Sequence, residues 1–138
     1  MNKKFFVAWI AVFVVWFLGS FLIHDTLLKA DYAQFAGMFR SDAEMMQHFP
    51  LMILAFAIMA GAFVWVYARG VEARPPVGQG LRFGIAVALL TCVPFNMINY
   101  VIAPYPGLLV MKQIVMDSVL LLILGIIVAS LYKAPAPR

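Results

Sequence analysis

Four long runs of apolar residues, separated by polar or proline-containing stretches, dominate the pattern of the chain. They cover residues 5–23, 50–68, 83–103 and 108–132. Each run is close to or above the roughly 20 apolar residues that a helix needs to cross a bilayer. Because backbone polar groups must be satisfied internally in lipid, each run is predicted to be a helix. The expected fold class is an all-α integral membrane protein, a bundle of four transmembrane helices.

Composition supports this class and limits the domain organisation. Of the 138 residues, 65% are hydrophobic and 12% are charged, whereas soluble domains carry about 25% charged residues. The four runs leave no room for a separate soluble domain, so residues 1–138 are predicted to form one membrane domain. The first run is expected to stay uncleaved, because no small-x-small cleavage pattern follows it before His24.

The basic residues predict the orientation of the helices. Of the ten, three would lie on one side or just inside it: Lys29, Arg40 and Lys112. The other seven fall on the opposite side, namely Lys3, Lys4, Arg69, Arg74, Arg82, Lys133 and Arg138. Cytoplasmic segments carry an excess of Lys and Arg. Both termini and the connection between the second and third spans are therefore expected in the cytoplasm.

The connection at 24–49 is the only long one, and this orientation places it outside. Apolar residues recur in it at steps of three and four: Leu28, Tyr32, Phe35 and Phe39. This spacing predicts a short amphipathic helix in the outer interface, which would leave Lys29, Asp31 and Gln34 in water. The following residues 41–44, Ser-Asp-Ala-Glu, form a capping-box pattern, which predicts that the second long helix begins near Asp42.

Asp117 is the first candidate for chemistry. It lies about 13 Å along the fourth span, near the middle of a hydrocarbon core about 30 Å thick. A carboxylate there costs about 2.5 to 3.5 kcal/mol, so it is expected to face protein or water and to have a partner. Gln113 lies one turn earlier on the same face. Lys112 is about 140° round the helix, a poor position for an ion pair, and its amine can extend outwards instead.

The third span adds polar residues that could meet this face. Asn96, Asn99 and Tyr100 share one side of the helix, and Pro94 is expected to kink the helix just before them. The predicted polar intramembrane cluster is therefore Asp117, Gln113, Asn96, Asn99, Tyr100 and Lys112. A network that only holds the helices together is more common than a transport or proton site, and both interpretations stay open.

Cofactor and metal chemistry find little support in the sequence. His24 closes the first span and His48 opens the second, which makes them weak candidates for a haem or metal pair. The lone Cys92 excludes an internal disulfide and a cysteine-rich metal site. No catalytic motif is present, so no catalytic residue, cofactor or metal is expected, and an enzyme is the less favoured class. The scattered basic residues argue against nucleic-acid binding.

The order of features resembles an uncharacterised bacterial family of short four-span membrane proteins, a domain of unknown function. The similarity lies in residues 16–19 (Trp-Phe-Leu-Gly), the loop 27–40, residues 80–84 (Gly-Leu-Arg-Phe-Gly) and the region of Gly125. The resemblance implies no activity and transfers no functional residue. The expected location is the cell inner membrane, as a multi-pass protein.

Three functions remain open at this point. The first is a non-catalytic accessory or assembly subunit of a larger membrane complex, with lipid and other membrane subunits or further copies of itself as partners. The second is a small homo-oligomeric transporter that couples to protons or cations through Asp117. The third is a redox subunit that binds haem or quinone. Small size and the absence of motifs favour the first.

Overall fold

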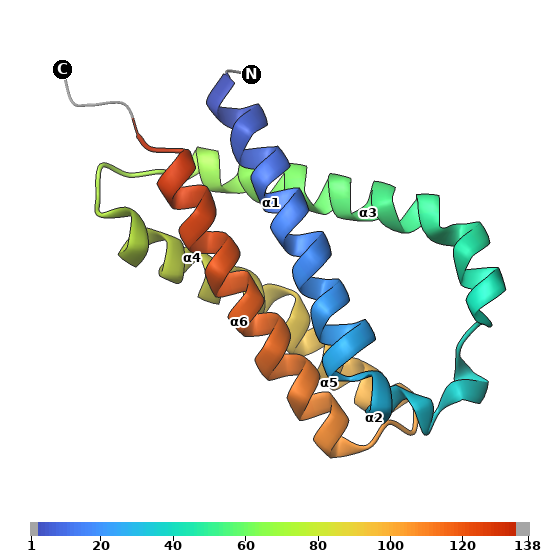
Figure 1. Cartoon of the computed structure of the whole chain (residues 1–138). Helices are drawn as coiled ribbons and strands as arrows, with labels where there is room; N and C mark the ends of the chain where they lie inside the picture. The colour runs from blue at the N-terminus through green and yellow to red at the C-terminus, as the bar shows by residue number, and fades with distance from the viewer. Residues whose placement is uncertain (1–2, 135–138) are drawn as a thin grey trace.

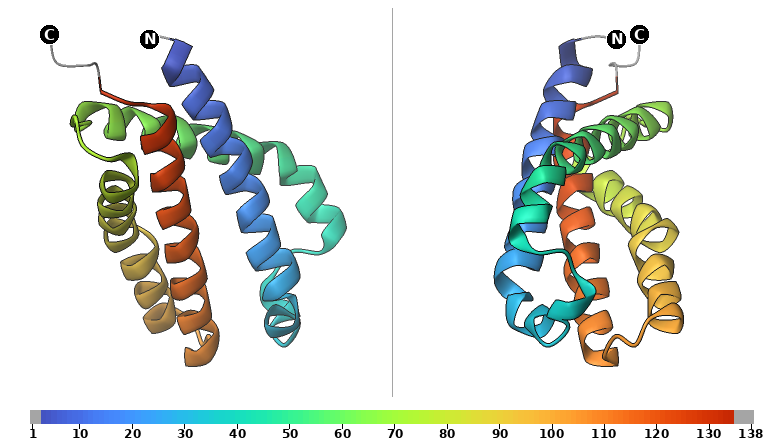
Figure 2. Two further views of the ribbon diagram at one scale, coloured as in Figure 1. Left: turned by 60° about the vertical axis from the view of Figure 1, so that its left-hand side comes forward. Right: turned by 90° about the vertical axis from the view of Figure 1, so that its right-hand side faces the viewer.

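The structure, a computed structural model, describes residues 3–134 and is helical throughout its regular elements in that range. Four segments are long and apolar enough to cross a membrane: Lys3–Leu27, Asp42–Arg69, Pro76–Ile102 and Gly107–Leu131. The prediction of four long apolar helices is therefore confirmed. The start of the first segment and the end of the fourth lie at the same end of the molecule, which we call the terminal end (Figure 2).

Residues 3–134 contain more elements than four plain helices. In chain order these are α1 (Lys3–Phe21), the π-helix η1 (Leu22–Leu27), α2 (Lys29–Ala33), the 3-10 turn η2 (Ala36–Met38), α3 (Asp42–Arg69), α4 (Pro76–Leu90), α5 (Cys92–Ile102) and α6 (Gly107–Leu131). The connection between α1 and α3 and the connection between α5 and α6 lie together, away from the terminal end (Figures 1 and 2). We call this the loop end.

A capping box fixes the start of α3. The Ser41 hydroxyl accepts the backbone N–H of Glu44, and the Glu44 carboxylate accepts the backbone N–H of Ser41 at 3.0 Å. The predicted start near Asp42 is confirmed. The 28 residues of α3 span about 42 Å at 1.5 Å per residue, more than a hydrocarbon core about 30 Å thick. A helix of this length must tilt or project from the core, and α3 is steeply inclined to α1 and α6 (Figure 1).

The third long segment is broken at Thr91, as Pro94 predicts. Proline has no N–H for the carbonyl four residues earlier, and its ring clashes with that carbonyl. The backbone of Thr91 leaves the helical region (φ −120°, ψ −86°), so α4 ends at Leu90 and α5 begins at Cys92. The Thr91 hydroxyl donates to the carbonyl of Val87 at 2.7 Å. The break lets α5 take a direction different from that of α4.

Helices α4 and α6 pack backbone to backbone. A Cβ atom on Gly80 would lie 2.4 Å from the carbonyl oxygen of Gly125, and one on Gly84 would lie 2.7 Å from that of Leu121. Small residues at these positions allow two helix axes to approach closely. Gly80, Gly84 and Gly125 all belong to this close contact.

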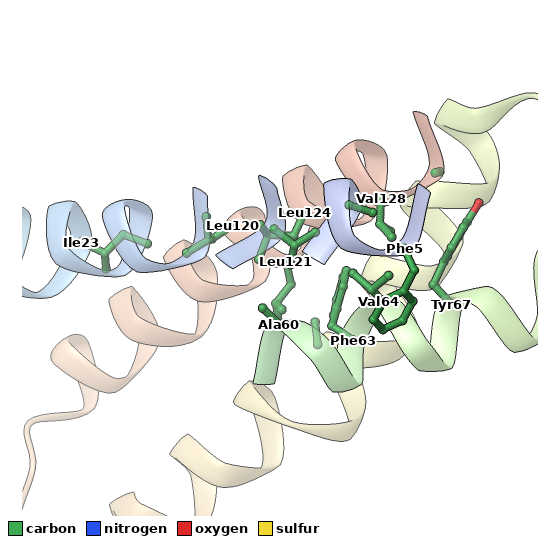
Figure 3. Close-up of a cluster of buried hydrophobic side chains, with 14 of the residues drawn as sticks. Phe5, Ile23, Ala60, Phe63, Val64, Tyr67, Leu120, Leu121, Leu124 and Val128 are labelled. Carbon is green, nitrogen blue, oxygen red and sulfur yellow. The ribbon is translucent and has the colours of Figure 1, made fainter. Parts of the chain in front are cut away.

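A buried core lies where α1, α3 and α6 cross. Val12, Val64, Leu124 and Val128 are fully buried there. Figure 3 shows Phe5, Val64, Leu124 and Val128 gathered between the three helices. The Trp9 indole N–H donates to the backbone carbonyl of Ala57 at 2.8 Å, which ties α1 to α3 directly.

The connection after η1 packs on the bundle. Leu28 is fully buried, and Tyr32 and Phe35 pack against the core, whereas Phe39 is exposed. The expected amphipathic helix is reduced to the five residues of α2. For Leu28 the expectation of burial in lipid is corrected, because protein covers this side chain. Whether the segment lies in a membrane interface stays a prediction.

Candidate functional site

Asp117 on α6 pairs with His24 on η1. The Oδ1 atom of Asp117 lies 3.1 Å from Nε2 of His24, with the two side chains 20% and 37% exposed. Asn96, Asn99 and Gln113 were expected to share a cluster with Asp117, but none of them bonds to it within residues 3–134, so this part of the expectation is corrected. The backbone N–H of Leu28 bonds to the carbonyl of Ile23, five residues earlier, so His24 lies in a π-turn, a form often found at functional sites.

The pair continues into a hydrogen-bonded chain that ends on α6 again. His24 Nδ1 lies 2.8 Å from the Tyr32 hydroxyl, and Gln113 Nε2 donates to the same hydroxyl at 2.8 Å. Since Gln113 donates to the tyrosine oxygen, the tyrosine proton is free for His24 Nδ1. The proton of a neutral imidazole then sits on Nε2 and is donated to Asp117. Each hydrogen bond from Gln113 to Asp117 then has one donor and one acceptor when His24 is neutral and Asp117 is ionised.

Tyr32 is suited to the middle of this chain. Burial raises the pKa of its phenol above the ordinary value, because a phenolate would lose its hydration there. The group therefore keeps its proton at neutral pH and acts as a donor to His24. From its spacing Tyr32 was expected only as part of an apolar stripe, although its hydroxyl indicates a polar partner.

An ion pair also joins α2 to α6. Both carboxylate oxygens of Asp31 lie 3.0 Å from the Lys112 amine. The expectation that Asp31 is left in water is corrected, because its carboxylate is paired and its side chain is only 23% exposed. Lys112 therefore pairs with Asp31 and not with Asp117, as its position round the helix predicts. Together the two links hold α2 against α6.

The remaining predicted residues do not join this network. Asn96 is buried, but its amide donates to the carbonyl of Cys92 in its own helix at 2.8 Å. Tyr100 is 52% exposed, and no side-chain bond links Asn99 to the network within residues 3–134. His48 is exposed and bonds through Nδ1 to the carbonyl of Glu44. The two histidines therefore have different partners and do not form a pair.

A cleft of about 690 Å³ lies beside the His24–Asp117 pair. Its walls come from α1, α3, α6 and the broken third segment, and they are mostly apolar. Trp16, Phe56, Met59, Phe95 and Leu120 are among the lining residues. The polar side chains that border the cleft are Ser20, His24, Thr91, Cys92 and Asp117. The cleft thus joins a large apolar volume to one ionisable pair.

The chain matches no protein-family model, no curated protein and no solved structure. The resemblance to a four-span bacterial family stays a prediction.

Proposed function

We propose that this chain is a small proton- or cation-coupled membrane transporter in which the His24–Asp117 pair is the coupling site. The observation that carries the proposal is the position of an ionisable pair on the wall of a cleft, within two apolar segments. Intramembrane acids that border cavities are commonly parts of proton or substrate pathways.

The free oxygen of Asp117 favours a functional role over a purely structural one. Within the described residues, Oδ1 bonds to His24 and no hydrogen bond reaches Oδ2. Oδ2 is not enclosed by protein, because no buried side-chain oxygen or nitrogen within residues 3–134 lacks a partner. An oxygen left open beside a cleft can bind and release a proton or a cation.

The orientation belongs to the same proposal. The excess of basic residues favours a cytoplasmic terminal end in the inner membrane, which would place the pair and α2 towards the outside. Reporter fusions after Arg74 should be active in the cytoplasm, and one within 34–39 should be active outside. The opposite result at both sites would reverse the direction of the pathway.

Carbodiimide labelling tests whether Asp117 exchanges protons. Dicyclohexylcarbodiimide is lipid-soluble and adds to protonated carboxyl groups, so the purified protein in mild detergent should be modified at Asp117. Labelling, measured by mass spectrometry of the peptide that contains residue 117, should fall as the pH rises, and Asp117→Asn should abolish it. An Asp117 that stays unmodified at every pH in correctly folded protein would refute the coupling role.

One observation favours a second candidate, an accessory subunit. Nearly every residue from Asp42 to Ala55 of α3 is exposed, including Met46 at 67% and Leu51 at 65%. The transmembrane helices of another subunit could cover this half of α3. Co-purification of the same membrane proteins in mild detergent, lost when Met46 and Leu51 are changed to tryptophan, would favour this candidate over the transporter.

A further inference from the structure

The charge around the cleft is set by very few groups. Of the lining residues, only His24, Asp117 and Cys92 can titrate. The nearby amine of Lys112 is occupied by Asp31 at 3.0 Å. A neutral His24 satisfies the hydrogen-bonded chain, and beside it an ionised Asp117 gives the cleft one uncompensated negative charge. In apolar surroundings such a charge is attracted to a cation more strongly than in water.

The walls determine which kind of cation fits. Trp16 from α1, Phe56 from α3 and Phe95 from α5 all line the cleft. The faces of aromatic rings carry negative charge and attract cations, and tryptophan does so most strongly. Met59 adds a polarisable thioether to the same wall. Three aromatic side chains on different helices could therefore contact one bound cation.

The size and chemistry of the cleft exclude a bare metal ion as the best occupant. A volume of about 690 Å³ lies within the range of roughly 300 to 1,000 Å³ that is typical of sites for drug-sized molecules. Hard metal ions need about six oxygen ligands, and no group of three His, Cys, Asp or Glu within residues 3–134 could hold one. An organic cation with an apolar body satisfies both the walls and the carboxylate.

We infer that the cleft binds a lipophilic organic cation, with Asp117 as its counter-ion and Trp16, Phe56 and Phe95 around its apolar body. This inference rests on the proposed function and names its substrate class. Proton coupling then follows from competition, because a proton and the cation would bind to the same carboxylate.

Equilibrium dialysis with two probes of the same shape and opposite charge tests the inference. Tetraphenylphosphonium is the cation and tetraphenylborate is the anion. The purified protein in mild detergent should bind the cation saturably and should not bind the anion saturably. In Asp117→Asn the dissociation constant for the cation should rise at least about tenfold, which corresponds to 1.4 kcal/mol.

Glu72→Gln is the matched control for the loss of one negative charge. Glu72 is 52% exposed and pairs with Arg74, outside the lining of the cleft, so this variant should bind the cation like the wild type. Equal binding of both probes, or unchanged affinity in folded Asp117→Asn, would overturn the inference. If neither probe binds while Asp117 is still labelled in a pH-dependent way, the substrate class is wrong and the coupling role stands. If the pH-dependent labelling of Asp117 is also absent, both the substrate class and the coupling role are refuted.

Discussion

The two sides of the bundle are built on opposite packing rules. On one side, glycines bring the backbones of α4 and α6 into direct contact. On the other side, large aromatic residues separate α1 from α3, with Trp16 against Phe63 at 5.5 Å and Phe17 against Phe56 at 5.4 Å between ring centroids. On the first side α4 and α6 leave no space between them. On the second side α3 is inclined to α1, and both helices border the cleft.

The comparison shows how a small membrane protein can hold a polar site without a large core. Helix α6 belongs to both sides, because it packs on α4 through Gly125 and presents Asp117 to the cleft. The rigid contact fixes the carboxylate, and the open side supplies the volume next to it. The following changes test this division, from the largest expected effect to the smallest.

Gly80→Ala should disrupt the rigid side. Its Cβ would lie 2.4 Å from the carbonyl oxygen of Gly125, a backbone atom that cannot rotate away. We expect a loss of about 3 kcal/mol, at the upper end of typical overpacking costs, measured by denaturant unfolding in mild detergent. Gly78→Ala is the control in the same helix, because a Cβ there meets nothing within 4 Å. Equal stability of the two variants would contradict backbone contact between α4 and α6.

Asp117→Leu and Asp117→Asn separate structure from function on the open side. Leucine leaves His24 Nε2 without its acceptor, which should cost about 2 kcal/mol. Asparagine keeps an acceptor for His24 and should cost less than about 1 kcal/mol, yet it should lose cation binding and carbodiimide labelling. The free energy of unfolding and the dissociation constant report the two effects separately. An Asp117→Leu variant as stable as the wild type would show that the pair adds nothing to the fold.

Tyr32→Phe should interrupt the chain between His24 and Gln113 while keeping the ring in place. The two hydrogen bonds of 2.8 Å at this hydroxyl predict a loss of about 1 kcal/mol. Carbodiimide labelling of Asp117 should also change its pH dependence, because His24 loses the donor that fixes its tautomer. Tyr100→Phe removes a hydroxyl from a residue that is 52% exposed. It should change neither quantity, and a similar effect in both variants would argue against a specific chain.

The Lys112–Asp31 ion pair should contribute least. Its side chains are 37% and 23% exposed, and partly exposed pairs are weakened by water and salt. A double-mutant cycle of Lys112→Met and Asp31→Asn should give a coupling of about 0.5 kcal/mol that falls further at high salt. A coupling above that of the Tyr32 hydroxyl would mean that this pair, and not the His24 chain, holds α2 on α6.

The features that could be predicted from the sequence are those that depend on neighbouring residues. Four apolar runs give four long helices, the Ser41–Glu44 capping box gives the start of α3, and Pro94 gives the break at Thr91. In each case the backbone or a side chain interacts with residues only a few positions away. The chemistry of the chain therefore specifies these features without the rest of the fold.

The site depends on contacts between distant residues, and most of it was missed. His24 and Asp117 are 93 positions apart, and the packing of α1 against α6 brings them together. A carboxylate within an apolar run marked Asp117 as a candidate site residue. The sequence did not indicate which residue it pairs with. Asn96 was expected in the cluster, yet the carbonyl of Cys92 in its own helix satisfies its amide at 2.8 Å. Helical periodicity shows which face a residue occupies, and not which bond it makes.

The π-turn at Leu22–Leu27 has a consequence for insertions and deletions in the chain. A turn closed by an i to i+5 bond holds one residue more than an α-turn, so removing one residue there leaves a regular α-helix on the same axis. Elsewhere in α1 a deletion would rotate all later residues by about 100°. A chain with one residue fewer between Phe21 and Leu28 would therefore keep the packing of the helices. Its His24 would no longer face Asp117. Proteins that share the fold but lack one residue between Phe21 and Leu28 would therefore lack the His24–Asp117 site.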